Sequence, residues 1–351
     1  MAVYRFALPS GPFKTYAYLS VPHCIGWTSS ALQSHIANWL HKTMAELEWQ
    51  VCADYALEPI VNTSTDRSER PAIQESGGFA DTSQLTGMVY CRGGIRGVGT
   101  VRRDWMGDFQ RLELTTIAPA YRAAEGSEGW DEFGGREVED ALAAYRLLGS
   151  FPWLRARPRV LMGFSRGSIT ATQAALRLPD LDALVLWGGV SNLLATYAER
   201  ADLRSTLRRA VRATPSRHPD LYRRRSPLYL AHALRCPILV MHGTADAQVD
   251  FHHATQMAQA LQRSGQRVVT HFYQGMGHHL PRPIHEAVLE RMRDELREFE
   301  RLAPISDARP QNQHDPQNQH DPQNQHDPLK QAGSRISSTY RSMSTRLPYR
   351  T

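Results

Sequence analysis

Residues 159–178 read RVLMGFSRGSITATQAALRL, and this stretch decides the fold. Its apolar start predicts a buried strand, and its last eleven residues have the pattern of a helix that ends before Pro179. Between them lies Gly163-Phe-Ser165-Arg-Gly167, a pentad of the form G-x-S-x-G. Strand, sharp turn and helix around a serine form a nucleophile elbow, in which the two glycines avoid side chains that would collide. The stretch therefore predicts Ser165 at the carboxyl end of a strand in an α/β fold.

Strands and helices alternate on both sides of this elbow, from residue 85 to about 304. The expected strands are mostly short apolar runs, as in a sheet covered on both faces, and lie at 87–91, 112–118, 159–164, 183–187, 237–242 and 267–273. Helical patterns lie between them or after them, at 137–148, 168–178, 251–263 and 283–302. The alternation predicts a catalytic domain over 85–304 with a doubly wound, mostly parallel sheet. An arginine-rich stretch at about 190–232 interrupts it and is expected to be a small helical lid.

Two segments flank this domain. Residues 1–84 are expected to be an extension with a strand at 15–22, an amphipathic helix at 29–52 and a polar loop at 58–84. Residues 305–351 contain three copies of PQNQHD at 310–327. A hexamer without an apolar side chain cannot bury enough surface to offset the entropy of ordering, so we expect a disordered tail. Its three histidines fit a solvated spacer better than a metal site.

Composition excludes several classes of protein. Of the 351 residues 41% are hydrophobic, which suffices for a large core. No apolar run approaches the length of a membrane-spanning helix, and the N-terminus does not resemble a signal peptide. The four cysteines have no C-x-x-C spacing, so we expect reduced thiols, no metal and a cytoplasmic location. The formal net charge is +6, but neither basic stretch matches a nucleic-acid-binding motif, so we expect no nucleic-acid or membrane partner.

A serine hydroxyl becomes a good nucleophile only when a base removes its proton and a carboxylate orients that base. In chains with a nucleophile elbow these partners follow in the order acid, then histidine. Asp246 comes just after the strand expected at 237–242, and His278 and His279 follow the strand expected at 267–273. Carboxyl ends of parallel strands meet at one edge of a sheet, so these groups are expected to converge. Asp246 as a mere helix cap, Asp250 as the acid and either histidine as the base remain open at this point.

The third requirement is an oxyanion hole. One donor is expected to be the backbone N–H of Arg166, the residue after the nucleophile, whose side chain need not take part. The second is expected from the loop after an earlier strand, where Gly93 and Gly94 allow close approach of backbone to substrate. A Gly-Gly pair is usually only a turn, but its place upstream of the elbow favours the functional interpretation.

The chain resembles the α/β-hydrolase superfamily, specifically the catalytic domain of prolyl-oligopeptidase-like (S9) serine hydrolases and their dienelactone-hydrolase-like relatives. The resemblance covers about residues 85–300 and is most specific at 125–140. It implies an α/β-hydrolase fold without cofactors, Ser165 as nucleophile, Asp246 as orienting acid and His278 rather than His279 as base. The segments that carry it are Arg92-Gly93-Gly94, AYR at 120–122, GSEG at 126–129, DEFGG at 131–135, the pentad, His242-Gly243-x-x-Asp246 and Gly277-His278.

The chain also departs from the family pattern. Ala123-Ala124 and Ser168 stand where relatives often have glycine, which leaves the fold intact but alters loop shape near the site. Full oligopeptidases carry a β-propeller that filters substrates by size, and the segment before the domain is too short for one. That departure weakens the inference to a peptidase and leaves an esterase open.

These features predict a serine hydrolase that cleaves a peptide, amide or carboxylic ester bond through an acyl-enzyme. The substrate is expected to be a small molecule or short peptide. Anionic substrates are one explanation for the basic lid, and a solvated surface is the simpler one. The alternatives are a small-molecule carboxylesterase of the dienelactone-hydrolase type and a catalytically silent binding module. The sequence does not indicate the substrate or the oligomeric state.

Overall fold

The computed structural model describes residues 2–52, 85–95 and 99–302. The polar loop expected at 58–84 and the tail expected at 305–351 lie outside the described residues. Within the described part, all four cysteines are free thiols. No described helix combines the length and the apolar character that crossing a bilayer requires.

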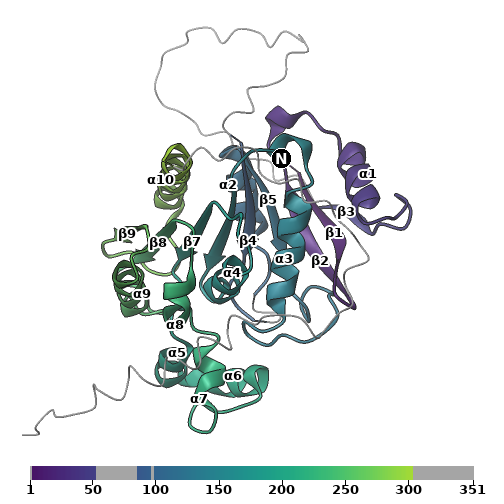
Figure 1. The fold of residues 1–351 in the computed structure, drawn as a ribbon. Coiled ribbons are helices and arrows are strands. Elements are labelled where there is room, and N and C mark those ends of the chain that lie inside the picture. Colours follow the sequence, from purple (N-terminus) through teal and green to yellow (C-terminus); the bar gives the residue numbers. More distant parts are fainter. Residues whose placement is uncertain (1, 53–84, 96–98, 303–351) are drawn as a thin grey trace, which may run out of the picture. The chain divides into compact units, whose positions relative to one another are not determined.

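In the described residues nine strands form one mixed sheet in the order β3-β1-β2-β5-β4-β6-β7-β8-β9 (Figure 1). The strands from β5 to β9 in this order are parallel to one another, whereas β2, β1 and β3 continue the sheet beyond β5 as antiparallel strands. The bounds are Val3–Ser10 (β1), Phe13–Ser20 (β2), Trp49–Cys52 (β3), Thr86–Cys91 (β4), Leu114–Pro119 (β5), Arg159–Phe164 (β6), Ala183–Trp187 (β7), Ile238–Gly243 (β8) and Val268–Tyr273 (β9). Every residue of the central strands β4, β5, β7 and β8 is buried, as expected for strands covered on both faces.

Helices cover both faces of the sheet (Figure 1). The buried side chains form two large clusters between the sheet and these helices. One cluster of buried side chains includes residues of α1 (Ser29–Trp39), α3 (Glu137–Leu148), α4 (Gly167–Ala175) and α9 (His252–Arg263). The other includes residues of α2 (Arg103–Arg111) and α10 (Arg282–Arg301). The predicted doubly wound, mostly parallel sheet is therefore confirmed.

The helix expected at 29–52 is wrong beyond its first half. Helix α1 ends at Trp39, and His41 takes a left-handed conformation with φ 53° that stops helix propagation. The apolar residues beyond it belong to a turn and to strand β3, where the Trp49 ring stacks on Tyr4 of β1 with ring centroids 4.9 Å apart. The helical spacing of apolar residues thus continues by chance into the edge strand β3. Contacts with β1, and not the local pattern, decide which residues of β3 are buried.

Two further elements were not expected from the sequence. Strand β1 forms a hairpin with β2 from Val3 to Ser20, and so extends the parallel sheet. Helix α2 is rich in polar residues, but its middle residues from Trp105 to Gln110 are buried between the sheet and other helices. Tertiary burial overrides the weak local signal in both elements.

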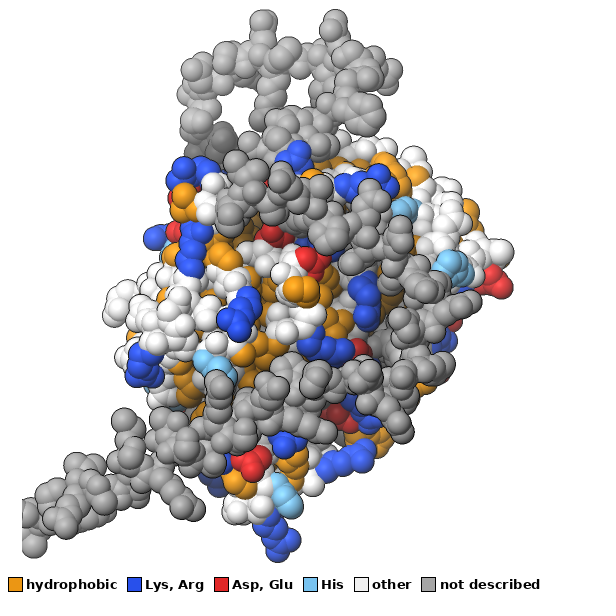
Figure 2. Space-filling model, viewed as in Figure 1, with side chains coloured by type: hydrophobic (Ala, Val, Ile, Leu, Met, Phe, Trp, Pro, Cys, Tyr) orange, Lys and Arg blue, Asp and Glu red, His pale blue; other side chains and the backbone are white. Residues whose placement is uncertain are grey.

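The lid expected at 190–232 is helical. It contains α5 (Leu193–Glu199), α6 (Arg204–Val211), α7 (Pro219–Arg223) and α8 (Pro227–Leu230), joined by 3-10 turns η5 (Ala201–Leu203) and η6 (Ala231–Ala233). A small apolar cluster, including Leu207 and Tyr222, packs these helices on Phe133 and Ile169. Figure 2 shows basic side chains scattered over the visible face rather than gathered in a single stripe.

Candidate active site

Ser165 lies at the tip of the predicted elbow, between β6 and α4. Its φ is +55°, the left-handed region that residues with a Cβ adopt only at a cost of about 1–2 kcal/mol. A Cβ on Gly163 would lie 2.5 Å from Ser168 Cα, and one on Gly167 would lie 1.9 Å from the Cys91 carbonyl oxygen. Both pentad glycines are therefore required by backbone contacts. The Ser165 amide donates to the Trp187 carbonyl at 2.9 Å, which ties the elbow to the end of β7.

Asp246 and His278 form a direct pair. Nδ1 of His278 lies 2.6 Å from Oδ2 of Asp246, and both residues are buried. The other carboxylate oxygen accepts the backbone N–H groups of Gln248 and Val249 at 2.8 and 3.0 Å. Burial opposes ionisation of this carboxyl, but hydrogen bonds from His242 and His278 outweigh it and hold the pKa of Asp246 well below its usual range. Asp246 is thus both a turn cap and the carboxylate that orients an imidazole.

The structure distinguishes Asp246 from Asp250 and His278 from His279. Asp250 lies just before the N-cap residue Phe251 of α9, where it accepts the backbone N–H of His252 at 2.9 Å and pairs with the His252 ring. The ring of His279 lies 5.2 Å from that of His278, and burial lowers its pKa. The described hydrogen bonds include none between His279 and an acid, so His278 alone has the carboxylate partner that an orienting pair requires.

The paired imidazole lies beside the elbow. The ring of His278 is 4.8 Å, centroid to centroid, from that of Phe164, the residue before Ser165. A Cβ on Gly188 would be 3.3 Å from the His278 ring, and Gly188 follows the strand residue to which the Ser165 amide is bonded. The carboxyl ends of β6, β8 and β9 therefore bring the predicted serine, acid and histidine to one region, beside the end of β7. Within the described hydrogen bonds, none joins the Ser165 hydroxyl to His278, and such bonds often tighten only when substrate is bound.

His242, which the sequence places only within the family segment His242-Gly243-x-x-Asp246, is a second imidazole on the same carboxylate. Its Nε2 lies 3.3 Å from Asp246 Oδ2 and 2.9 Å from the Val249 carbonyl oxygen, and the residue is fully buried at the end of β8. The i, i+4 spacing of His242 and Asp246 was the available signal. The His242 imidazole contacts Oδ2 of Asp246, whereas the turn amides bond Oδ1, so together they fix the carboxylate.

The two predicted oxyanion residues Gly93 and Gly94 lie against the elbow. A Cβ on Gly93 would be 2.9 Å from Ser165 Cβ, and Gly94 has φ +68°. The loop follows β4, which neighbours β6 in the sheet, so strand order alone brings it to Ser165. Arg166 follows Ser165 immediately before α4, where free N–H groups favour negative charge.

Comparison with known proteins identifies the family of the chain. Residues 126–302 match the model of the prolyl oligopeptidase family, which is half of the chain. The chain belongs to the prolyl oligopeptidase family. It is 35% identical to the uncharacterized peptidase YtmA of Bacillus subtilis over 203 residues, which span 58% of this chain and 79% of that protein. It is also 24% identical to the inactive dipeptidyl peptidase 10 of Mus musculus over 148 residues, which span 42% of this chain and 18% of the mouse protein.

Solved structures share the fold of this prolyl oligopeptidase family member. A puromycin-hydrolyzing peptidase of Mycobacterium tuberculosis superposes with a TM-score of 0.56 over 85% of this chain and 39% of its own, at 19% identity. An acylaminoacyl peptidase of Pyrococcus horikoshii superposes with a TM-score of 0.51 over 62% of this chain and 37% of its own, at 18% identity. This chain thus spans less than half of those longer chains. The expected α/β-hydrolase fold is confirmed.

The Arg166 side chain is the main feature of this family member that sequence reasoning missed. It is only 2% exposed, and its Nη1 donates to the Gly94 carbonyl at 2.7 Å and to Asp131 Oδ2 at 2.8 Å. Its Nη2 donates to Glu137 Oε1 at 3.4 Å. The DEFGG segment was the only signal, because its acid lies in the part of the chain most specific to the family. The side chain therefore links the elbow, the Gly93–Gly94 loop and the start of α3.

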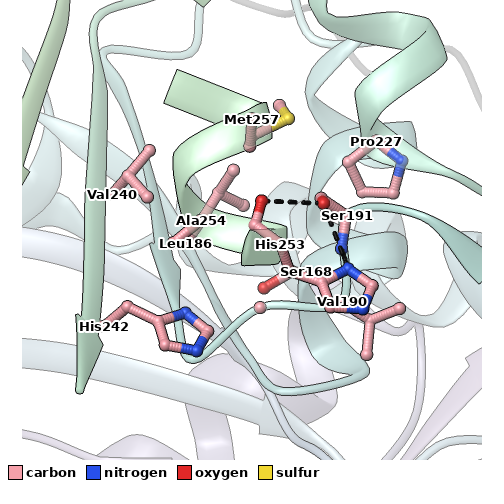
Figure 3. A pocket seen from close by; sticks show the side chains of 11 residues that line it. Ser168, Leu186, Val190, Ser191, Pro227, Val240, His242, His253, Ala254 and Met257 are labelled. Atoms are coloured by element: carbon pink, nitrogen blue, oxygen red, sulfur yellow. Dashed lines mark hydrogen bonds between the residues drawn. The ribbon is translucent and has the colours of Figure 1, made fainter. Parts of the chain in front are cut away.

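Glu199, His252 and His253 are the described residues that come together as potential metal ligands. Nδ1 of His253, however, accepts the backbone N–H groups of Ser191 and Asn192 at 3.2 and 3.3 Å. A neutral imidazole with an accepting Nδ1 carries its proton on Nε2, so the atom that faces Glu199 is a donor and not a ligand. The small neighbouring cavity, about 10 Å³ and lined partly by His242 and Ser168, has room for one water but not for a substrate (Figure 3).

Proposed function

We propose that this protein is a serine hydrolase that cleaves a peptide, amide or carboxylic ester bond through an acyl-enzyme. Ser165 would be the nucleophile, His278 the base and Asp246 the orienting acid. The single observation that carries the proposal is the 2.6 Å pair of Asp246 and His278 beside a serine held at φ +55°. Family membership and the Ser, Asp, His order along the chain support the same roles.

The reaction follows from the roles of these three groups. The Ser165 oxygen attacks the substrate carbonyl carbon while His278 Nε2 takes the hydroxyl proton. The carbonyl oxygen becomes an oxyanion, and the imidazolium then gives its proton to the leaving amine or alcohol as that bond breaks. Water attacks the acyl-enzyme by the reverse sequence, which releases the acid and regenerates the serine. Asp246, whose pKa is held low, remains ionised throughout and stabilises the imidazolium.

The oxyanion would be held by the Arg166 backbone N–H and by an N–H of Gly93 or Gly94. The contact of Gly93 with Ser165 Cβ and the position of Arg166 before α4 support this assignment. Such donors act on charge that develops in the transition state, and removal of one commonly lowers the rate by about a hundredfold or more.

A small molecule or short peptide is the proposed substrate, with peptide bond cleavage as the first candidate. The similarity to a protein named as a peptidase supports it. A carboxylesterase of the dienelactone-hydrolase type is the second candidate, because the same residues cleave esters. One mammalian relative is named as inactive, so a silent binding module is the third. The intact pairing of Asp246 with His278 argues against that third candidate.

A fluorophosphonate probe on the purified full-length protein tests the proposal. We expect labelling of the wild type, none of Ser165→Ala, and strongly reduced labelling of His278→Gln. Ser264→Ala, in which the lost hydroxyl only bonds the Ala260 carbonyl, is the matched control and should label normally. Folded wild type that resists labelling would favour the binding module. Rates on p-nitrophenyl esters against aminoacyl-p-nitroanilides then divide esterase from peptidase.

A further inference from the structure

Two buried arginines donate hydrogen bonds to the backbone carbonyls of the Gly93–Gly94 loop. Arg92 is fully buried, and its Nη1 donates to the Gly93 carbonyl at 3.0 Å. Arg166 is 2% exposed, and its Nη1 donates to the Gly94 carbonyl at 2.7 Å. Two consecutive carbonyl groups of a diglycine segment are therefore each held by a guanidinium.

Holding a carbonyl also sets the direction of the next amide. In a trans peptide the C=O and the following N–H point in opposite directions, and the described residues contain no cis peptide. The Arg92 bond to the Gly93 carbonyl therefore orients the N–H of Gly94, and the Arg166 bond to the Gly94 carbonyl fixes the other end of the same residue. Without such bonds two adjacent glycines have the widest backbone freedom of any dipeptide.

The two arginines are anchored to different parts of the fold. Arg92 donates from Nε and Nη2 to the Ala120 carbonyl at 3.0 and 2.6 Å, just beyond β5. Arg166 is anchored by Asp131 and Glu137. Both guanidinium groups also lie over the ring of Tyr121, with Cζ 4.8 and 5.4 Å from its centroid. The loop is thus braced against β5 and α3, which are rigid elements.

The carboxylates beside Arg166 are themselves fixed by backbone. Glu137 accepts the N–H groups of Phe133 at 3.0 Å and Gly135 at 2.8 Å, and Asp131 accepts from Phe133 at 3.0 Å. The two carboxylates do not carry charge equally. Burial raises the pKa of Glu137 to about 7, whereas Arg166 outweighs burial at Asp131 and holds the pKa of that carboxyl below its usual value. Asp131 is therefore the charged partner that offsets the cost of burying the Arg166 guanidinium.

We propose that the side chains of Arg92 and Arg166 are positioning residues that hold the Gly93–Gly94 loop in the orientation the oxyanion requires. We call the two arginines with Asp131 and Glu137 the guanidinium latch. The inference rests on the proposed function but adds residues that act through the loop and not on the substrate. Because an error of about 1 Å in such a group lowers the rate about a hundredfold, releasing the latch should slow catalysis more than it weakens substrate binding.

Arg166→Met tests the latch, with Arg177→Met as matched control. Arg177 pairs with Glu139 of α3 just as Arg166 pairs with Glu137, but on the exposed surface. On the best ester substrate we expect kcat to fall about ten- to a hundredfold for Arg166→Met, with KM within about threefold. The control should stay within twofold in both.

A second readout separates positioning from general destabilisation. A substrate-like aldehyde forms a tetrahedral adduct with an oxyanion, whereas the matching alcohol binds without one. Arg166→Met should lose about tenfold or more in aldehyde affinity and little in alcohol affinity. Equal losses for both inhibitors, or an unchanged kcat, would overturn the latch.

Asp131→Asn keeps the test decisive where Arg166→Met does not fold. The variant preserves shape and removes the charge that Arg166 Nη1 faces at 2.8 Å. The same selective loss of aldehyde affinity, smaller in size, is expected, and its absence in a folded variant refutes the proposal. A wild type that hydrolyses nothing and resists the fluorophosphonate would instead refute the proposed function, so the two failures are distinguishable.

Discussion

The backbone of Ser165 is strained, and its neighbours make that strain tolerable. The residue sits at φ +55° while its own N–H and C=O are bonded to Trp187 and to Val190 and Ser168. At the two flanking glycines, the backbone of Ser168 and of Cys91 leaves no room for a Cβ. Such a conformation persists only where surrounding contacts over-determine it, which is typical of a functional residue.

Gly93→Ala is the sharpest test of close packing at this scale. Its new methyl group would meet Ser165 Cβ at 2.9 Å, so the serine or the loop must shift. We expect kcat/KM on esters to fall at least tenfold while the melting temperature changes little, because the contact lies at a site and not in the core. Steady-state kinetics and thermal unfolding measure both quantities.

Gly265→Ala supplies the opposite pattern as a control. Gly265 has φ +69° and nothing within 4 Å of its would-be Cβ, so alanine there costs about 1 kcal/mol of stability. Activity should be unchanged. If Gly93→Ala kept full activity, the loop would not touch the reacting serine.

At the scale of single elements, α9 and the lid depend on a neutral histidine. His253 of α9 is 1% exposed, and its Nδ1 accepts the amides that begin the lid after β7 (Figure 3). Burial, with the charge of His252 adding to it, lowers the pKa of His253 from 6.5 to about 4. The folded protein therefore resists protonation that the unfolded chain accepts.

This shift predicts acid sensitivity with a defined sign. Between pH 6.5 and pH 4 the unfolded chain binds more protons at His253 than the folded protein does. The contribution of His253 to the free energy of unfolding is therefore fully present above pH 6.5 and is lost as the pH drops toward 4. The expected loss is about 3 kcal/mol in the free energy of unfolding. Urea unfolding at pH 7 and pH 4.5 measures it, and His253→Gln should be less pH-dependent than the wild type.

His252→Gln is the control for that measurement. Its imidazole is only half-buried and makes surface pairs with Asp250 and Glu199. The wild-type pH dependence should persist in this variant. A His253→Gln protein as acid-sensitive as the wild type would exclude His253 as the cause.

At the scale of the whole molecule, the first strands belong to the main sheet. Strands β1 and β2 cover the side of β5 that would otherwise be an open edge, and α3 packs on β1. Phe6 of β1 and Leu19 of β2 are fully buried in the same core cluster as Leu161 of β6. Strands β1 and β2 therefore contribute to the core and to edge protection.

Truncations of buried side chains in β1 and β2 should cost as much stability as a truncation in the inner strand β6. We expect Phe6→Ala or Leu19→Ala to lower the free energy of unfolding by about 2–5 kcal/mol, as much as Leu161→Ala. Val51→Ala on β3, at a side chain 52% exposed, should cost under about 0.5 kcal/mol. Urea unfolding compares the four variants, and a cost below about 1 kcal/mol for both β1 and β2 variants would show that these strands are dispensable.

Local patterns predicted most of the parallel sheet because its strands and helices carry strong signals. The bounds expected for β6 at 159–164, β7 at 183–187 and α3 at 137–148 match the structure to the residue. Prediction failed where local signals are weak: the helix at 29–52 was twice too long, and β1 and α2 were missed. In those segments the burial of side chains depends on elements far away along the chain, as in the packing of α3 on β1 and of α2 on β2. A short stretch of sequence does not contain both partners.

Local signals suffice to predict the elbow around Ser165, because its strand, turn and helix lie within residues 159–178. The sequence by itself also determined the order of the polar residues at strand ends, since strand and turn signals are local as well. Only the tertiary structure decided that Asp246 bonds His278 and not His279, and that Arg92 and Arg166 close on one loop. Hydrogen bonds of this kind depend on ångström distances between segments up to 72 positions apart, and only the packed sheet sets those distances.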